Sequence, residues 1–389
     1  MAHEISIEAG LDFQITEEMN MLRQTAREFA ETEIRPHVMK YDEAQEFPMP
    51  IIKKMAELGF LGATVPQELE GSGLTALEFI MIMEEIARVD PSVALTLAAH
   101  SGLCLEHLLM WGNEEQKKRY VPDLATGRAI GSWCLTEPFS GSDAGGMRTE
   151  AVLDGNSYVL NGSKTFITNG SFAATFVVIA KSQKSEGKKG ISAFIVERGM
   201  KGVSVGKKEN KLGMRASDTV QVLFDNVRVP KENLIGREGE GFKQALGVLD
   251  SGRIGIAALS VGLAQGAFEA AVKFSKERQA FGKPISEFQG IQFKLADMAT
   301  EIQAARLLAM RAAWTKAQGR PINLVAAQAK YFASEVAQRA ATEAVQIHGG
   351  YGFIKEFPVE KFYRDVKLLT IGEGTSEVQR MVIARNILS

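Results

Sequence analysis

Cysteine is scarce in this chain, and so is net charge. Only Cys104 and Cys134 occur among 389 residues, which is too few for a disulfide framework and is typical of a reducing compartment. The formal net charge of -2 gives no basic field of the kind that selects nucleic acid or an anionic membrane surface. We therefore expect no nucleic-acid partner.

Apolar runs of membrane-spanning length are missing as well. Charged or polar side chains interrupt the longest apolar regions; they are Glu84, Glu85, Arg88, His100 and Glu106. The opening residues, Met1 to Ser6, show neither an apolar signal core nor an arginine-rich transit pattern. These absences predict no membrane insertion and a cytoplasmic location, or a mitochondrial matrix location if a presequence has been removed.

The chain does have enough apolar sequence for a large core. It is 45% hydrophobic and 24% charged, over a length that accommodates two or three domains. Helical periodicity dominates the first and last thirds, and short runs of Val, Ile, Phe and Thr fill the middle. The expected fold class is α+β, mainly α, with an N-terminal helical domain over 1–128, a middle antiparallel β domain over 129–235 and a C-terminal four-helix bundle over 236–389.

Local signals predict individual helices. Thr16, Thr75 and Pro91 predict the starts of three helices, which end near Pro36, Pro91 and Gly112. In the last third, apolar residues recur every three or four positions, as in a helix that packs in a bundle. These residues are Ile291, Leu295, Met298, Ile302, Ala305 and Ala309.

Turn pairs predict how the middle region folds. Asp154-Gly155, Asn161-Gly162 and Asp225-Asn226 each predict a break between strands. Asn161-Gly162 is the strongest hairpin signal of the three. The alternation of side chains then places Phe166 and Thr168 on one face of the following strand.

A glutamate between two glycines stands near the C-terminus. Gly372 and Gly374 let backbone and a flat ligand approach Glu373 closely, which suits a general base. Ser376 and Gln379 have the spacing of a capping box at the start of a helix with an apolar stripe; the stripe is Val378, Met381, Val382 and Ile383. A helix N-terminus favours the carboxylate and burial favours the acid, so both protonation states stay open. Taken alone, the segment favours a solvated turn glutamate.

Four other segments precede it in a fixed order. They are 133–143 (WCLTEPFSGSD), 164–170 (KTFITNG), 278–282 (RQAFG) and 346–352 (QIHGGYG). Together with the Glu373 segment, they resemble the acyl-CoA dehydrogenase family of flavoproteins, over essentially the whole chain. No Rossmann glycine fingerprint follows a predicted strand, so a different scaffold is expected to hold the cofactor.

The resemblance implies an FAD site assembled from several segments. The residues implied at the cofactor are Trp133, Leu135, Thr136, Ser142, Phe166, Ile167, Thr168, Arg278, Phe281, Gln289, Gln346, Ile347, Gly349, Gly350, Thr375 and Glu377. Within this set, the residues Arg278, Phe281 and Gln289 are implied to reach the FAD of a neighbouring subunit, and a homotetramer is expected. Each segment also has an ordinary structural interpretation. The 133–142 segment suits a passage from a strand to a loop, and Phe166 suits a core aromatic. The segments at Arg278 and Gln346 suit a helix end followed by a turn.

The resemblance also implies contacts to an acyl-CoA substrate by Ser142, Asp250, Arg253 and Gly374. Arg253 has the alternative of pairing with Asp250 on one helix face, because the two are three residues apart. Some family members carry the catalytic glutamate at position 252. This chain has Gly252 there, so Glu373 is the expected base.

The implied reaction gives a trans-2-enoyl-CoA. Glu373 removes the α-proton, the β-hydrogen leaves as hydride to flavin N5, and the backbone N–H of Glu373 and a flavin hydroxyl stabilise the thioester oxygen. Electron transfer flavoprotein is the implied acceptor. Phe166 departs from the family's usual tryptophan, and Gly372 from the tyrosine of many straight-chain relatives. The second departure favours a wider cavity for a branched, cyclic or aryl acyl group.

Two other interpretations stay open. One is a flavin oxidase of the same fold that passes electrons to oxygen, which peroxide formation would reveal. The other is a noncatalytic helical binding protein, which would fail to bind FAD.

A metal site is a further question, because His100, Cys104 and His107 share one helix face. Zinc normally takes a fourth ligand or an open water position, and no neighbouring carboxylate pattern completes this set. We expect no metal, and instead a place in the core or along the acyl cavity.

Overall fold

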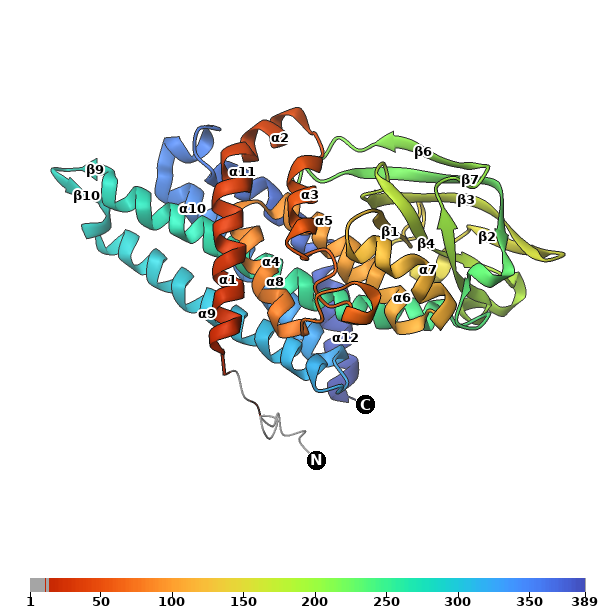
Figure 1. Cartoon of the computed structure of the whole chain (residues 1–389). Coiled ribbons are helices and arrows are strands. Elements are labelled where there is room, and N and C mark those ends of the chain that lie inside the picture. The colour runs from red at the N-terminus through yellow and green to blue at the C-terminus, as the bar shows by residue number, and fades with distance from the viewer. Residues whose placement is uncertain (1–10, 12–13, 389) are drawn as a thin grey trace.

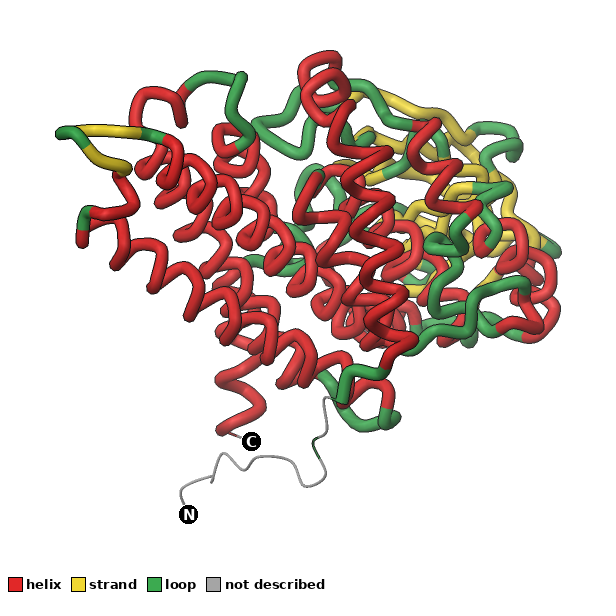
Figure 2. Tube along the Cα trace, turned by 60° about the vertical axis from the view of Figure 1, so that its left-hand side comes forward, coloured by secondary structure: helices red, strands yellow, loops and turns green. Residues whose placement is uncertain are grey.

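The structure is a computed structural model that describes residue 11 and residues 14–388. Helices form the first and last thirds of the chain, and a sheet forms the middle third (Figures 1 and 2). The strands of this sheet lie at one end of the molecule, and the long helices extend away from it. The expected fold class is confirmed. The division at residues 128 and 235 stays a prediction.

The N-terminal third is helical, as expected. Its helices are α1 (Glu17–Phe29), α2 (Val38–Ala44), α3 (Met49–Glu57), α4 (Ala76–Val89), α5 (Pro91–Ala99), α6 (Glu106–Trp111) and α7 (Glu114–Ala125). Thr16 caps α1 and Thr75 forms a capping box with Glu78 at α4, so both predicted starts are confirmed. A π-helical segment, η4 (His100–Leu105), joins α5 to α6 in one continuous helical run that ends at Gly112.

The sheet is mixed rather than purely antiparallel. Its strands are β1 (Ile130–Cys134), β2 (Glu150–Asp154), β3 (Ser157–Thr168), β4 (Ala173–Lys181), β5 (Ile191–Glu197), β6 (Val203–Lys208), β7 (Thr219–Pro230) and β8 (Leu234–Ile235). The order is β6-β7-β3-β2-β4-β5-β8, and β1 pairs with β4 in parallel. The expectation of an antiparallel sheet is therefore wrong for β1, which joins the sheet directly from the N-terminal helices.

The predicted hairpin at Asn161-Gly162 is also wrong. The strand β3 continues through these residues, and the β2–β3 hairpin instead turns after Asp154, which pairs with Ser157. Asp225-Asn226 likewise lies inside β7. Asn161 and Asn226 face each other across a register shift, where the backbone N–H of Asn226 donates to Asn161 Oδ1 at 2.8 Å. These signals mark a bulge because the two irregular positions satisfy each other across the ladder.

The C-terminal third is built on three long helices. Its elements are α8 (Gly241–Glu277), β9 (Gln279–Ala280), β10 (Lys283–Pro284), α9 (Gln289–Ala317), α10 (Asn323–His348), α11 (Val359–Asp365) and α12 (Ser376–Leu388). The predicted stripe on α9 is confirmed, since Met298, Ile302, Ala305 and Ala309 are buried. The stripe predicted on α12 is not buried in this chain, where the buried residues are Ser376 and Gln379. Met381 of that stripe is 62% exposed.

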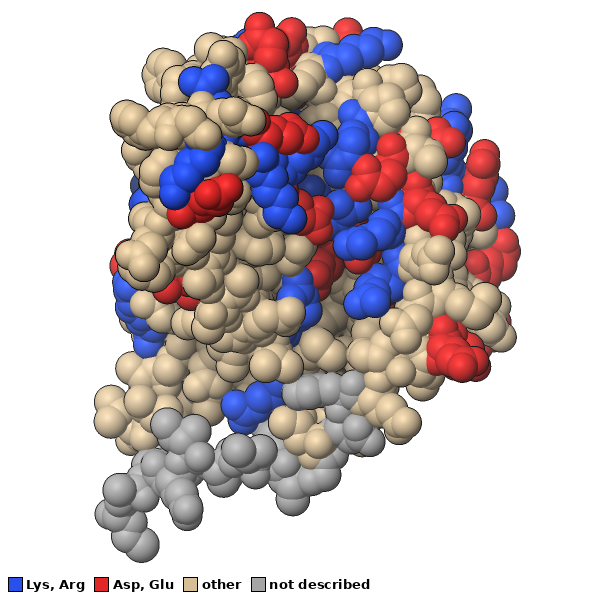
Figure 3. Space-filling view, turned by 90° about the vertical axis from the view of Figure 1, so that its left-hand side faces the viewer, with Lys and Arg blue, Asp and Glu red and all other residues tan. Residues whose placement is uncertain are grey.

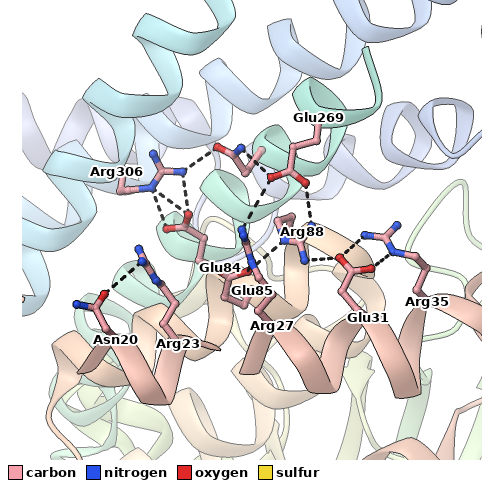
Figure 4. A network of polar contacts seen from close by, with 11 residues as sticks. Asn20, Arg23, Arg27, Glu31, Arg35, Glu84, Glu85, Arg88, Glu269 and Arg306 are labelled. Carbon is pink, nitrogen blue, oxygen red and sulfur yellow. Dashed lines mark hydrogen bonds and ion pairs between the residues drawn. The ribbon is translucent and has the colours of Figure 1, made fainter. Parts of the chain in front are cut away.

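A buried arginine ties the two helical thirds together (Figure 4). Arg88 of α4 contacts Glu31, Glu85 on its own helix, and Glu269 of α8. The side chain of Arg88 is 5% exposed, so its charge depends on these three carboxylates.

Two helical runs, Pro91–Trp111 and Gly241–Glu277, are long and apolar enough to cross a membrane by length and composition. In both, 78% of the most apolar window is buried inside the protein. Their apolar surface is therefore used by the core, as in the central helices of many globular proteins.

Candidate active site

Glu373 occupies a strained backbone position at the entrance to α12. Its φ is 53°, in the left-handed region that non-glycine residues seldom adopt. Neighbouring side chains hold the segment in place: Lys330 Nζ donates to the Gly374 carbonyl at 2.7 Å, and Gln379 Nε2 donates to the same carbonyl at 2.9 Å. Strain of this kind persists where the surrounding contacts impose it, and it is common at functional sites.

The predicted capping box at α12 is wrong in its residues. Thr375 Oγ1, rather than Ser376, accepts the hydrogen bond from the backbone N–H of Val378. Ser376 instead donates to Glu335 Oε1 at 2.6 Å. Because Gln379 is occupied with the carbonyls of the Glu373 segment, the helix start serves to fix that segment.

The carboxylate of Glu373 is sequestered from water. The residue is partly exposed overall, but Oε2 is shielded from solvent and has no hydrogen-bond partner. Burial raises the pKa of Glu373 to about 7, although the positive charges of Lys330 and Arg253 oppose this shift. The solvated turn glutamate is thereby excluded, and the carboxyl is balanced between acid and base near neutral pH.

Gly252 of α8 makes room for this carboxylate. A Cβ atom at position 252 would lie 2.3 Å from Glu373 Oε2 and 2.9 Å from Leu103 Cδ2. At position 372, a Cβ atom would make only ordinary contacts with Leu368, at 3.5 Å and beyond. A side chain at position 252 would thus force the ends of the Glu373 and Leu103 side chains to move, whereas one at position 372 would displace nothing.

Arg253 lies beside Glu373 and is paired within its own helix. Its Nη1 forms an ion pair with Asp250 Oδ1. Pairing within the helix was the alternative to a contact with CoA that the sequence spacing left open. Burial lowers the pKa of Arg253, and Asp250 and Glu373 oppose that shift. Its Nε atom is buried without a partner. Arg253 therefore retains a donor for a further polar group.

Gly252 is also one of the residues that line a cavity. Its walls come from the N-terminal helices, from α8 and from the end of α9, and the lining residues are Thr64, Ala76, Phe79, Ile80, Ala98, Ser101, Gly102, Glu106, Ser251, Gly252, Ile254, Gly255 and Lys316. His100, Cys104 and His107 do not line it. The lining of the cavity is mostly apolar, and Glu373 is not one of its lining residues.

The histidines that raised the question of a metal site are engaged in hydrogen bonds. His100 Nε2 contacts the Leu124 carbonyl at 3.0 Å, and its Nδ1 accepts from the backbone N–H of Gly131. His107 Nδ1 accepts from Trp133 Nε1 at 3.0 Å. Burial lowers the pKa of both histidines to about 4, so both rings are neutral at pH 7. Within the described residues, no cluster of potential ligands could hold a metal ion.

The loop after β1 brings the first group of cofactor candidates together. Trp133 and Leu135 are buried, Thr136 is partly exposed and Ser142 is exposed. The Thr136 carbonyl accepts from the backbone N–H of Thr165, which places this loop beside the end of β3. There Phe166 is 63% exposed at a φ of 57°, Ile167 is buried and Thr168 is partly exposed.

A buried ion pair fixes this loop. Lys164 Nζ donates to the Leu135 carbonyl at 2.9 Å and to Glu137 Oε1 at 2.7 Å, and the Lys164 side chain has no exposed surface. Burial alone would raise the pKa of Glu137, but Lys164 and backbone donors hold it below its usual value. The pair anchors the loop with a charge-assisted contact in the interior.

The second group lies at the other end of the molecule. Arg278, Ile347, Gly349 and Gly350 line one surface hollow, and the Arg278 guanidinium lies 5.3 Å from the ring centre of Tyr351. The neighbouring candidates are also solvent-facing: Gln289 and Gln346 are exposed, and Phe281 is 95% exposed. Figure 1 places β9 and β10 opposite the sheet, and Figure 3 shows that end with acidic and basic side chains interspersed. The two groups do not meet within one chain.

Sequence reasoning missed several of these residues. The predicted site residues did not include Lys330, Ser101, Gly102 or Lys316. Lys164 was noted only as the first residue of the 164–170 segment, and Glu106 only as a charge that interrupts an apolar region. Their burial depends on partners far away in the chain, such as Gly374 for Lys330 and Leu135 for Lys164. Sequence spacing carries no signal for such contacts.

Comparisons with known proteins cover the same three regions. The N-terminal, middle and C-terminal domains of acyl-CoA dehydrogenase match residues 16–128, 132–227 and 239–388. The short-chain specific acyl-CoA dehydrogenase of Clostridium acetobutylicum is 47% identical over 377 residues, which is 97% of this chain and 100% of that protein.

Solved structures agree. A chain from a study of the electron transferring flavoprotein of Acidaminococcus fermentans superposes with a TM-score of 0.96 at 49% identity, covering 97% of this chain and 100% of that one. An acyl-CoA dehydrogenase complexed with FAD from Bacillus anthracis superposes with a TM-score of 0.90 at 37% identity, covering 96% of this chain and 67% of that one. On these grounds, the chain belongs to the acyl-CoA dehydrogenase family and is a flavoprotein oxidoreductase.

Proposed function

We propose that this protein catalyses the FAD-dependent α,β-dehydrogenation of an acyl-CoA thioester to a trans-2-enoyl-CoA, with Glu373 as the base. The observation that carries this proposal is the Glu373 carboxyl, whose Oε2 is shielded from solvent without a hydrogen-bond partner and whose pKa is raised by burial to about 7. A base is most effective when its pKa lies near the operating pH.

Glu373 acts on the α-proton. This proton is weakly acidic, so the developing negative charge on the thioester oxygen needs a hydrogen-bond donor. We assign that role to the backbone N–H of Glu373, whose segment is held rigid by Lys330 and Gln379. The carboxyl then stores the α-proton in a site that is already shielded from water.

The residues present fit a flavin. Phe166 offers an exposed ring and Thr168 a partly exposed hydroxyl beside the 133–142 loop, where Trp133, Leu135, Thr136, Ile167 and Ser142 also lie. Thr375 and Glu377 at the start of α12 complete this group in the proposal. When bound, FAD supplies the hydride acceptor that α,β-dehydrogenation requires.

We propose a homotetramer, which is supported by the separation of the two groups within one chain. Arg278, Phe281, Gln289, Gln346, Ile347, Gly349 and Gly350 lie far from the loop of the same chain, so we propose that they contact the FAD of a neighbouring subunit. Exposed apolar side chains on the C-terminal helices, such as Phe293 at 63% and Met381 at 62%, support an interface there.

For the CoA portion, we propose Ser142, Asp250, Arg253 and Gly374. Arg253 has an unpartnered donor, and the Asp250–Arg253 pair orients it. Electron transfer flavoprotein is the proposed acceptor, supported by the similarity to the Acidaminococcus chain. We propose a cytoplasmic location on the basis of the bacterial relative, and a mitochondrial matrix location remains the alternative.

The test compares wild-type holoenzyme with Glu373→Gln and with a control, Glu356→Gln, at an exposed carboxylate. We expect Glu373→Gln to retain yellow bound FAD while turnover falls by about two to four powers of ten, the usual scale for loss of a general base. The control should keep full turnover. Near-normal turnover in Glu373→Gln would overturn the assignment, and hydrogen peroxide formation without an added acceptor would indicate an oxidase instead.

A further inference from the structure

Trp133, at the start of the proposed flavin loop, has its indole N–H bonded inside the protein. The indole Nε1 donates to His107 Nδ1 at 3.0 Å, and the centres of the two rings lie 6.4 Å apart. His107 has no exposed surface, and Trp133 is 8% exposed. An indole has one donor and no acceptor, so the side chain of Trp133 has no polar group left for a ligand.

This contact fixes the tautomer of His107. Because Nδ1 accepts from the indole, the proton of the neutral imidazole is on Nε2. Nε2 lies 3.0 Å from Gln244 Oε1 and therefore donates to it. The amide Nε2 of Gln244, which is also buried, donates to the Ile235 carbonyl at 3.0 Å. The hydrogen bonds therefore form one directed chain that runs from Trp133 through His107 and Gln244 to Ile235.

The hydrogen-bond chain joins four elements. Trp133 belongs to β1, His107 to α6, Gln244 to α8 and Ile235 to β8. The π-helical segment η4 directly precedes α6, and π-helical turns are frequent at functional sites. Apolar packing would hold the indole without a preferred direction, whereas a hydrogen bond depends on angle and fixes the orientation of the ring.

The residues on either side of Trp133 are held by a different element. Ser132 Oγ donates to the Thr168 carbonyl at 2.7 Å, and Lys164 Nζ donates to the Leu135 carbonyl at 2.9 Å. Thr168 and Lys164 both belong to β3. Residues 132 and 135 are thus tied to the sheet, while the side chain of Trp133 is tied to α6. The loop leaves the sheet from a residue whose orientation is set by the helix.

From this arrangement, we infer that His107 is a positioning residue for the flavin, because it fixes the Trp133 indole and with it the loop over 133–142. The inference rests on the FAD site of the proposed function and adds to it a residue that lies behind the proposed flavin contacts. Gln244 takes part at one further remove, since it accepts the Nε2 proton of His107. Trp133 itself can offer a flavin its ring and its backbone, but not its N–H.

The experiment measures how fast the holoenzyme loses FAD after dilution, through the fluorescence of the released flavin. The variants are His107→Leu, which removes the acceptor, and Trp133→Phe, which removes the donor and keeps an aromatic ring. Each should release FAD about 10-fold faster than the wild type, because an unpaired buried partner weakens the loop conformation that holds the flavin. Trp133→Phe provides the measurement if His107→Leu folds poorly.

A double variant shows whether His107 acts through Trp133. If it does, His107→Leu combined with Trp133→Phe should release FAD no faster than either single variant. Independent effects would multiply to about 100-fold, and that result would overturn the inference. His107→Asn should stay close to the wild-type rate, because its amide oxygen can accept from the indole N–H. Release from His107→Asn as fast as from His107→Leu would also count against the inference.

His100→Leu is the matched control. His100 is another buried histidine of the same helical run, and both of its partners are backbone groups, the Leu124 carbonyl and the Gly131 N–H. The midpoint of thermal melting should fall in both leucine variants, whereas FAD release should accelerate only in His107→Leu. Equal acceleration in the two variants would mean that a general loss of stability is the cause, and the inference would be wrong.

Failure of this inference is separable from failure of the proposed function. If the wild-type holoenzyme keeps FAD but no acyl thioester reduces it, the proposed function fails and positioning by His107 stands. If acyl thioesters reduce the flavin and His107→Leu releases FAD at the wild-type rate, positioning by His107 is wrong and the proposed function stands.

Discussion

Gly252 and Glu373 share one small volume. A Cβ atom on Gly252 would lie 2.3 Å from Glu373 Oε2, a separation that real Cβ contacts do not show. The two residues are far apart in the sequence and belong to α8 and to the turn before α12. A side chain at position 252 would therefore force the Glu373 carboxyl out of its present position.

Gly252→Ala should displace the carboxyl and lower turnover. Misplacement of a reacting group by about 1 Å can cost on the order of 100-fold in rate, and we expect a loss of that size in kcat. Gly247→Ala is the control on the same helix, where the new Cβ would meet only Met110 and Trp111 at 3.7 Å and 3.8 Å. Steady-state kinetics and thermal melting of both variants check this. Equal kinetics in Gly252→Ala and Gly247→Ala would contradict the steric argument.

The pH dependence of kcat/KM should report the Glu373 carboxyl. The carboxylate form is the base, so activity should rise with pH through an inflection near 7, where burial places the pKa. Lys330→Met removes a positive charge that stabilises the carboxylate, and its inflection should move to higher pH.

Lys330→Arg is the matched control for this prediction, because it keeps the charge and a donor for the Gly374 carbonyl. Its inflection should remain near that of the wild type. The measurement is kcat/KM from pH 5 to 9 at constant ionic strength. An inflection near the ordinary value of glutamic acid, or one that is the same in Lys330→Met, would rule out the electrostatic account.

Substitutions at Gly102 test whether the acyl chain of the proposed substrate reaches the cavity that Gly102 lines. Gly102 lines the cavity, and a Cβ atom there would meet no other atom within 4 Å, so the space is open for a ligand. Gly102→Ala should weaken turnover of the longer thioesters, and Gly102→Val should weaken it further, by about 10-fold or more for each methylene displaced. Comparing kcat/KM over a series of chain lengths tests this. A loss that is uniform over all lengths would show that Gly102 acts elsewhere.

Lys164→Met should destabilise the protein and loosen its flavin. The Lys164–Glu137 pair is buried, and removing one partner leaves an unpaired charge, which typically costs about 3–5 kcal/mol. Because Lys164 also bonds to the Leu135 carbonyl, the proposed flavin loop loses its anchor. Thermal melting and retention of bound FAD during dialysis are the measurements.

Arg228→Met controls for this loss of charge, since the Arg228–Asp154 pair is 60% and 62% exposed. Exposed pairs contribute about 0–1 kcal/mol, so little change is expected. The double variant Lys164→Met with Glu137→Gln should regain part of the lost stability. Equal destabilisation in Arg228→Met and Lys164→Met would mean that burial of the pair is not the cause.

Local signals in the sequence were sufficient for helix starts. Thr75 and Glu78 are three residues apart, and their hydrogen bonds close within that distance, so the capping box forms as predicted. Glu373 stood out because its two flanking glycines are its direct neighbours. The ordered segments around it were specific enough to indicate the family before any coordinates.

Competing hydrogen-bond partners explain the failures. Asn161-Gly162 looked like a hairpin turn, but Asn226 on a neighbouring strand satisfies it as a bulge. Gln379 does not form the predicted capping box and donates instead to the carbonyl of Gly374, five residues before it. The partner is distant in the sequence in the first case and local in the second, and in both the spacing alone suggested a different hydrogen bond.

The amino-acid sequence by itself determined the helical and strand regions and the family, because these depend on neighbours within a few positions or on a fixed order of segments. The tertiary structure decided the pKa of Glu373, its close approach to Gly252 and the hydrogen bond that His107 accepts from Trp133. Those three features arise from burial and from contacts between distant segments, and desolvation acts only once the chain has folded around the group.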